Sequence, residues 1–280
     1  MPASKNVNTH IALRWGSMRP TTVFRQFMLL AIFFFALVAQ AEESYIVVTG
    51  ADSNPPFSGP ELPQGGLITE IIREAIARMG AESQVEYLPW NHAYRRADSA
   101  LVLGAYPYVK DAERLQHFFF STPLYVTVER FFVVHDSDIT FSRDSDLQGL
   151  ILCRPLGYSL ESVNHLIEQN VVRLWAPNDL ATCFQLLAAG RVNLVPIGEE
   201  TGYSVIAENF PAPDDFKVLT KPIQVNGYHL MVSKEYPHAT EILQRFDDEV
   251  MGMWNEGRIA ALYAKHHTAL PPVEMFHLAP

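Results

Sequence analysis

The chain has 280 residues, of which 48% are hydrophobic and 19% are charged. This composition is ordinary for a globular protein and excludes collagen-like, low-complexity and disordered classes. The net charge is −10, and it becomes −14 without the first 41 residues, because these hold four cationic residues and no acidic one. An acidic surface gains no counterion release from a polyanion, so we expect neither nucleic acid nor an anionic membrane among the partners.

The first 41 residues predict an export signal. Arg25 precedes an unbroken apolar run over 27–38, and a small-x-small site follows at 39–41. The run is shorter than the roughly 20 residues that cross a bilayer, which disfavours a membrane anchor. We therefore expect cleavage after Ala41 and a periplasmic product without a membrane anchor. Met18, which precedes the run, is an alternative start.

Strand-like and helix-like segments alternate along the rest of the chain. The predicted strands cover 45–49, 84–88, 101–103, 130–135, 150–153, 171–174, 192–197 and 229–232. The predicted helices cover 66–79, 91–97, 159–169, 179–189, 239–256 and 258–266. This alternation predicts βαβ units with parallel strands, and two such units in tandem predict an α/β protein with two lobes.

Motifs for cofactors, metals and nucleophilic catalysis are absent from the sequence. There is no glycine-rich phosphate loop and no zinc-ligand spacing, and the segment 157–161 fails the nucleophile-elbow pattern at its last position. The pair His266-His267 favours a solvated tail over a metal site. We expect no cofactor and no metal.

Short segments in a fixed order carry a resemblance that covers nearly the whole mature chain. They are Asn54-Pro55-Pro56-Phe57-Ser58, Gly65-Gly66, Pro89-Trp90, Ala93-Tyr94, the segments 107–114 and 120–125, Leu147-Gln148-Gly149, Gly157-Tyr158-Ser159, the segment 187–193, Val232-Ser233-Lys234 and the segment 254–258. In this order they resemble the bacterial extracellular solute-binding proteins of family 3, which have the type II periplasmic binding fold.

The resemblance implies two α/β lobes joined by two crossing strands, with the ligand between the lobes. Lobe 1 would comprise 42–132 and 230–280, and lobe 2 would comprise 136–226. The hinge strands would be 130–135 and 228–232.

The resemblance also implies residues for a carboxylate. The family's arginine that pairs with the ligand α-carboxylate matches Arg114, and a guanidinium suits that role because it offers two parallel hydrogen bonds. The alternative is a surface arginine in a charged segment. Gly157, Tyr158 and Ser159 lie between a predicted strand and helix, where free backbone N–H groups favour an anion, although Ser159 can equally be a plain N-cap.

Aromatic residues and one carboxylate complete the implied site. By analogy Phe57, Trp90, Tyr106 and Tyr108 face the cleft, with Trp90 and Tyr108 the strongest candidates. Glu199, and less so Glu200, matches the family's amine-binding carboxylate, but one residue out of register and in place of the usual Asp. A second departure is Val109, which replaces a hydroxyl residue. These departures leave open an α-amino acid, a related polar carboxylate, an amine-bearing molecule or a small peptide.

The resemblance implies a monomeric periplasmic protein that captures a small polar solute for an inner-membrane ABC permease, with no catalysis. A variant of this role reports to a membrane sensor instead. The enzyme alternative is an exported dehydratase of the cyclohexadienyl dehydratase type, with Glu199 as its general acid.

Cys153 and Cys183 are the only cysteines of the chain. An oxidising compartment favours pairing of two thiols within reach, and Cys153 ends a predicted strand while Cys183 lies on the apolar face of a predicted helix. We expect a disulfide; two buried free thiols are the alternative.

Overall fold

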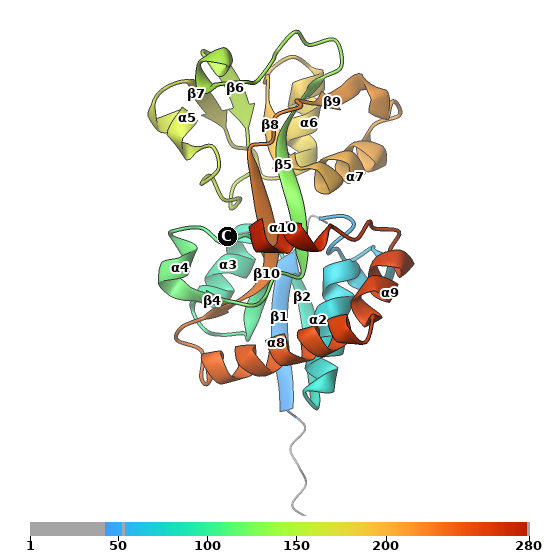
Figure 1. The fold of residues 1–280 in the computed structure, drawn as a ribbon. Coiled ribbons are helices and arrows are strands. Elements are labelled where there is room, and N and C mark those ends of the chain that lie inside the picture. Colours follow the sequence, from blue (N-terminus) through green and yellow to red (C-terminus); the bar gives the residue numbers. More distant parts are fainter. Residues whose placement is uncertain (1–42, 52–53, 279–280) are drawn as a thin grey trace, which may run out of the picture. The chain divides into compact units, whose positions relative to one another are not determined.

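Two long antiparallel strands connect the two lobes of the fold in the computed structural model (Figure 1). The structure describes residues 43–51 and 54–278, which belong to one compact unit. The expected export signal lies outside the described residues. The strands are β1 (Glu43–Gly50), β2 (Ala81–Leu88), β3 (Gly104–Tyr108), β4 (Phe118–Phe120), β5 (Tyr125–Val134), β6 (Leu150–Cys153), β7 (Val172–Trp175), β8 (Val195–Gly198), β9 (Phe216–Val218) and β10 (Gln224–Ser233).

Helices cover the strands in both lobes. The α-helices are α2 (Leu67–Arg78), α3 (Trp90–Asp98), α4 (Arg114–His117), α5 (Asn164–Glu168), α6 (Leu180–Ala188), α7 (Glu199–Asn209), α8 (Ala239–Asn255), α9 (Arg258–Lys265) and α10 (Val273–Leu278). Short 3-10 helices in the described residues are η1 (Pro63–Gly65), η2 (Asp144–Leu147) and η3 (Pro213–Asp215). Within the described part of the chain, no helix has both the length and the apolar character needed to cross a membrane.

The main sheet has the strand order β2-β1-β3-β10-β5-β8, with β4 also paired to β10 and β9 to β5. The pairs β1–β2 and β1–β3 are parallel, as the βαβ pattern predicts, and β6 and β7 form a separate parallel pair. Strands β5 and β10 belong to both lobes and pair antiparallel over 125–129 and 224–228. They are longer than the expected hinge segments, and the exact lobe limits stay a prediction.

Each lobe has hydrophobic clusters of its own, and in lobe 2 the side chains of β5 pack on both faces of the strand. In lobe 2, Phe131 packs with Leu152 and its neighbours, whereas Phe132 packs with Phe184. In lobe 1, the apolar stripe of α2 packs against residues of β1, β3, β5, β10, α8 and α9. That core includes Val47, Ile68, Ile71, Ile72, Tyr106, Tyr125, Leu230, Phe246, Leu262 and Tyr263.

Two expected elements were placed wrongly. The third strand begins at Gly104, beyond the predicted segment 101–103, because the buried residues of this stretch continue to Tyr108. The helix expected over 159–169 is only α5, from Asn164 to Glu168, and turns fill the stretch before it. Gly157 has a φ of +85°, which supports a turn rather than a helix start.

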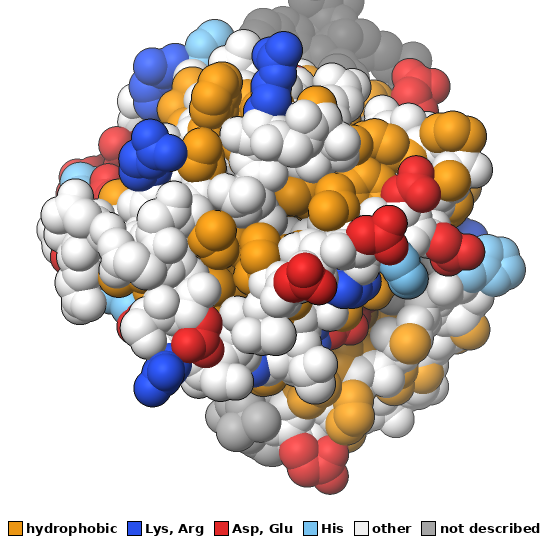
Figure 2. All heavy atoms as spheres, turned by 90° about the horizontal axis from the view of Figure 1, so that it is seen from above, with side chains coloured by type: hydrophobic (Ala, Val, Ile, Leu, Met, Phe, Trp, Pro, Cys, Tyr) orange, Lys and Arg blue, Asp and Glu red, His pale blue; other side chains and the backbone are white. Residues whose placement is uncertain are grey.

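The surface at the lobe 2 end is mixed in character. Figure 2 looks onto this end and shows hydrophobic side chains between charged side chains of both signs. The exposed large hydrophobic residues of this lobe include Leu156, Trp175 and Tyr203.

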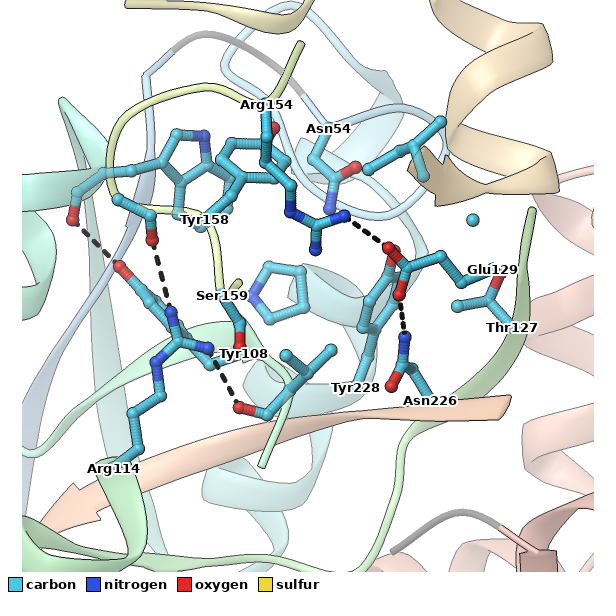
Figure 3. A pocket seen from close by; sticks show the side chains of 16 residues that line it. Asn54, Tyr108, Arg114, Thr127, Glu129, Arg154, Tyr158, Ser159, Asn226 and Tyr228 are labelled. Carbon is cyan, nitrogen blue, oxygen red and sulfur yellow. Dashed lines mark hydrogen bonds and ion pairs between the residues drawn. The ribbon is translucent and has the colours of Figure 1, made fainter. Parts of the chain in front are cut away.

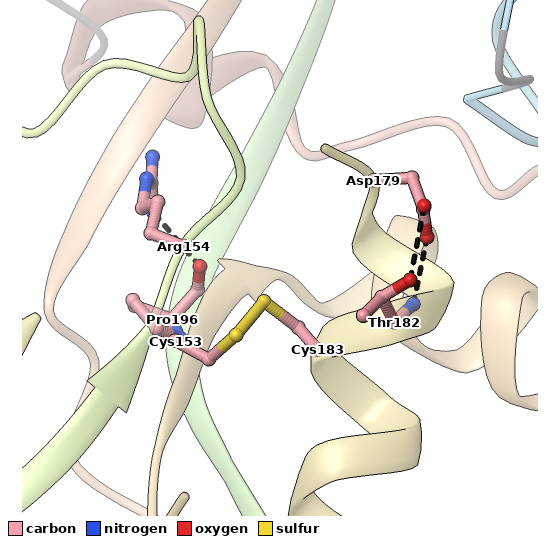
Figure 4. Close-up of a disulfide and its surroundings, with 6 residues drawn as sticks. All are labelled: Cys153, Arg154, Asp179, Thr182, Cys183 and Pro196. Carbon is pink, nitrogen blue, oxygen red and sulfur yellow. Dashed lines mark hydrogen bonds between the residues drawn. A yellow bond between two sulfur atoms is a disulfide. The ribbon is translucent and has the colours of Figure 1, made fainter. Parts of the chain in front are cut away.

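The expected disulfide is confirmed. Cys153 at the end of β6 bonds to Cys183 on α6, with the two Cα atoms 5.6 Å apart (Figure 4). Both residues are fully buried. The bond ties the small β6–β7 sheet to a helix that covers the other core of lobe 2.

Strand β10 buries a histidine near an acidic residue of α8. His229 is fully buried, and its Nδ1–H donates to the carbonyl of Ser121 at 2.7 Å. Burial lowers the pKa of His229 to about 3, and the nearby charge of Lys110 acts in the same direction. Burial raises the pKa of Asp247, which accepts from the backbone N–H of Thr122, to about 6.

The disulfide predicts a loss of stability when both cysteines become alanine. The bond closes a loop of 30 residues, so the double variant should lose roughly 3 to 4 kcal/mol of unfolding free energy through gained chain entropy. Denaturant unfolding measures the change. Alkylation of unreduced, denatured periplasmic protein followed by mass spectrometry checks the bond itself, and two alkylated cysteines would contradict it.

The buried histidine predicts acid sensitivity. A histidine with a depressed folded-state pKa stabilises the fold above its ordinary pKa of 6.5, and this stabilisation is lost as the pH falls toward 3. His229→Gln should therefore flatten the dependence of unfolding free energy on pH between 6.5 and 3. Denaturant unfolding at a series of pH values gives the slope, and an unchanged slope contradicts the assignment.

Asp247→Asn provides a control of opposite sign. A carboxyl with a raised folded-state pKa stabilises the fold below its ordinary pKa of 3.8, and this contribution fades as the pH rises through 6. Its removal should steepen the loss of stability on acidification.

Candidate functional site

A cavity of about 60 Å³ lies where the two lobes meet beside β5 and β10 (Figure 3). Residues of both expected lobes line it: Asn54, Trp90, Pro107, Tyr108, Val109, Arg114, Thr127, Glu129, Arg154, Gly157, Tyr158, Ser159, Ile197, Gly198, Asn226 and Tyr228. A larger groove of about 550 Å³ adjoins it and shares Arg114 and 157–159. The cavity brings together most of the residues that the sequence suggested.

Arg114 is one of two buried arginines in the cavity wall. Its backbone N–H donates to the Asp111 carboxylate at 2.8 Å, which fixes the turn before α4, and its side chain is 8% exposed. Nη1 donates to the carbonyl of Val109 at 3.0 Å and lies 3.3 Å from Asp111. Nη2 donates to the carbonyl of Gly157 at 3.2 Å, so Arg114 links the two expected lobes.

Aromatic rings form one wall of the cavity, as expected for Trp90 and Tyr108. The ring of Trp90 meets those of Tyr108 and Tyr158 edge-on, with centroid distances of 5.5 and 6.1 Å. The Tyr108 hydroxyl donates to the carbonyl of Trp90 at 2.9 Å. The guanidinium of Arg114 lies 4.9 Å from the centroid of the Tyr108 ring, within the range of a cation–π contact.

The second arginine, Arg154, was not identified from the sequence. It follows β6 directly and is 5% exposed. Its Nη1 donates to Glu129 of β5 and, at 2.7 Å, to the carbonyl of Pro196. Glu129 is 1% exposed and also accepts from Ser162 at 3.1 Å and Asn226 at 2.7 Å. These contacts compensate a buried pair of charges that would otherwise be costly.

Gly198 on β8 leaves room for the side chain of Thr127 on β5. A Cβ atom built there would lie 2.4 Å from the Thr127 hydroxyl oxygen, so a side chain would displace Thr127. Thr127 donates to Glu200 at 2.5 Å. The close approach of β8 to β5 therefore depends on Gly198.

The loop over 157–159 lines the cavity, but the prediction that it lies at the start of a helix is wrong. Ser159 is not at a helix N-terminus, because α5 begins at Asn164. The Ser159 hydroxyl instead accepts from the backbone N–H of Glu161 at 3.3 Å. The loop enters the site through the Gly157 carbonyl and the Tyr158 ring.

Four of the suggested residues lie outside the cavity. Phe57 and Tyr106 are fully buried in the core of lobe 1, where Phe57 packs on Tyr125 and the Tyr106 hydroxyl donates to Thr69. Tyr106 precedes Pro107 on β3, and alternation along the strand turns it to the core face. The carboxylates of Glu199 and Glu200 bond to Arg130 and to Thr127. Neither glutamate lines the cavity.

A weak signal for the missed residues exists in the sequence. Glu129 interrupts an apolar strand, and Arg154 follows a strand that is apolar throughout; both are positions where a charge requires a partner. The partner of a buried charge is not readable from one sequence, but Asn226 lies on the strand that pairs with β5. Among the described residues, no group of three or more His, Cys, Asp or Glu side chains is arranged to hold a metal ion.

No protein-family model and no curated protein matches the sequence. Solved structures do match it. A histidine kinase sensor domain with similarity to periplasmic binding proteins has 21% sequence identity and a TM-score of 0.71, and the match covers 83% of this chain and 100% of that one. An arginine 3rd transport system periplasmic binding protein from Legionella pneumophila has 18% identity and a TM-score of 0.68, with 80% and 100% covered.

A third match is an ancestral arginine-binding protein bound to arginine, with 19% identity, a TM-score of 0.69, and 80% of this chain and 98% of that one covered. At these identities the likeness concerns the fold. The chain therefore has the two-lobed α/β fold of type II periplasmic binding proteins, as the ordered sequence segments implied.

Proposed function

We propose that the chain is a periplasmic solute-binding protein of family 3 that captures a small polar, carboxylate-bearing solute between its lobes for an inner-membrane ABC permease. One observation carries this proposal: the interlobe cavity contains two buried guanidinium groups, Arg114 from lobe 1 and Arg154 from lobe 2. A guanidinium matches the geometry of a carboxylate and stays charged when buried.

Contacts across the cavity support a mechanism in which the lobes close over the solute. Besides the bond between Arg114 and the Gly157 carbonyl, the hydroxyl of Thr201 donates to Asn54 Oδ1 at 3.0 Å. Both contacts join a lobe 1 residue to a lobe 2 residue. Two hinge strands permit such closure with little change inside either lobe.

Glu199, the candidate general acid of the enzyme alternative, is not among the residues that line the cavity. Its carboxylate pairs with Arg130. The solved structures with this fold described above are binding proteins and a sensor domain. The same binding step would serve a sensor partner in place of a permease, so solute capture is common to both roles.

The proposal predicts that a panel of small carboxylates contains a solute that stabilises the protein and closes it. A solute at 100 times its Kd should add about 2.7 kcal/mol to the unfolding free energy. Thermal shift identifies the solute, and solution scattering with and without it should show a smaller radius of gyration on binding. Mass spectrometry of the recovered solute should show no turnover; a converted solute would favour the enzyme alternative.

A second prediction concerns Arg114. Arg114→Ala should weaken carboxylate binding at least 100-fold, because the change removes a buried charged partner of the solute and a contact between the lobes. Calorimetry gives the affinity, and circular dichroism checks that the fold is retained.

Arg96→Ala is the matched control, because Arg96 pairs with Glu86 away from the cavity and its side chain is 35% exposed. Its affinity should equal that of the unmodified protein. If Arg114→Ala binds as tightly as this control, Arg114 is not part of the site.

A further inference from the structure

Arg154 has hydrogen-bond donors that the protein does not use. Its guanidinium donates from Nη1 to Glu129 and to the Pro196 carbonyl. Nε is buried, and within the described part of the chain it has no hydrogen-bond partner. Figure 3 shows the guanidinium at the cavity wall with its other terminal nitrogen turned toward the interior. A buried N–H without an acceptor is unfavourable, so this edge of Arg154 requires one.

Glu129 is already occupied by donors from the protein. One carboxylate oxygen accepts from Arg154 and from Ser162 at 3.1 Å, and the other accepts from Asn226 at 2.7 Å. Its charge is compensated by Arg154 at direct contact. Glu129 therefore positions Arg154 and is a poor partner for a second cation.

Three further acidic groups near the cavity have partners in the protein, whereas Glu113 and Glu161 are exposed in the adjoining groove. Asp111 accepts from the backbone N–H of Arg114, and its other oxygen lies 3.3 Å from Arg114 Nη1. Glu199 pairs with Arg130, and Glu200 accepts from Thr127. Among the described residues lining the cavity, Glu129 is the one acidic side chain. An ammonium group inside the cavity would thus meet only the carboxylate of Glu129, whose charge Arg154 already compensates.

Asn54 supplies further hydrogen-bond donors to the cavity. Its Oδ1 accepts from Thr201 at 3.0 Å, which leaves the amide N–H groups for the cavity. Figure 3 shows this amide nitrogen on the same side as the Arg154 guanidinium. The two residues come from different lobes and present the same hydrogen-bonding character.

We infer that the solute is a small organic acid whose carboxylate pairs with the Nε and Nη2 edge of Arg154, and that it brings no ammonium group into this cavity. The inference rests on the proposed function, since it names the chemistry of the solute captured there. The carboxylate supplies two acceptors in the plane of the guanidinium, which is the bidentate geometry that this edge favours.

Pairs of compounds that differ only in the ammonium group test this inference. Calorimetry and thermal shift on the purified protein should compare propionate with L-alanine, succinate with L-aspartate, and glutarate with L-glutamate. We expect the acid of at least one pair to bind at least 10-fold more tightly than its amino acid. Tighter binding of the amino acids overturns the inference and leaves the proposed function intact. Binding of no compound, by folded protein, overturns both.

Variants of Arg154 identify the residue responsible. Arg154→Gln should weaken binding of the acid at least 100-fold, and Arg154→Lys at least 10-fold, because an ammonium retains the charge but not the paired N–H groups. Arg130→Gln is the matched control: Arg130 lies on β5 next to Glu129 and, like Arg154, pairs with a glutamate, yet it lies outside the cavity. Affinity of Arg154→Lys equal to that of the control overturns the role of Arg154, and circular dichroism shows that each variant is folded.

Discussion

The buried ion pair between Arg154 and Glu129 is the interaction on which the geometry of the site depends. Removing two charges from water costs several kcal/mol per ion, and the attraction between them offsets this only when the remaining hydrogen-bonding groups are also satisfied. Here Ser162, Asn226 and the Pro196 carbonyl supply these bonds. Since Glu129 lies on a hinge strand and Arg154 follows β6, the pair fixes the second lobe against the strand along which the lobes are joined.

The rest of lobe 2 holds Arg154 in place through its backbone. Its N–H donates to the carbonyl of Trp175 at 3.0 Å, and the preceding residue, Cys153, donates to Leu194 at 2.8 Å and is held by the disulfide. By contrast, Arg114 contacts lobe 2 through a single carbonyl, that of Gly157. The proposed solute contact of Arg154 thus lies on a part of the fold that several bonds hold, while the contact of Arg114 with lobe 2 can open without disturbing either core.

The sequence was sufficient for the fold and for part of the lining of the candidate cavity, because those features depend on local patterns. The apolar stripe of α2 and the alternation of strands and helices predicted the layers, and Arg114, Trp90 and Tyr108 were found through short segments that keep their order. The pair of Glu129 and Arg154 was missed because its members are 25 residues apart and meet only through packing of β5 against lobe 2. Phe57 and Tyr106 were misplaced because an aromatic residue next to a cleft and one in the adjoining core have the same local pattern.

The net negative charge of the chain disfavours the approach of an acid, so the selection of an acid requires a local cause. With a net charge of −10, the long-range field opposes the approach of an anion, but that field is screened over about 8 Å at physiological ionic strength. Inside the cavity the two guanidinium groups act at short range and in a poorly solvated environment, where hydrogen bonds to charged groups are strongest. An amine in the same place would leave the buried N–H groups of Arg154 without acceptors, and sites built around such donors reject ligands that lack the matching group by large factors. In the proposed mode of binding, discrimination therefore follows from these buried donors, and not from the net charge of the protein.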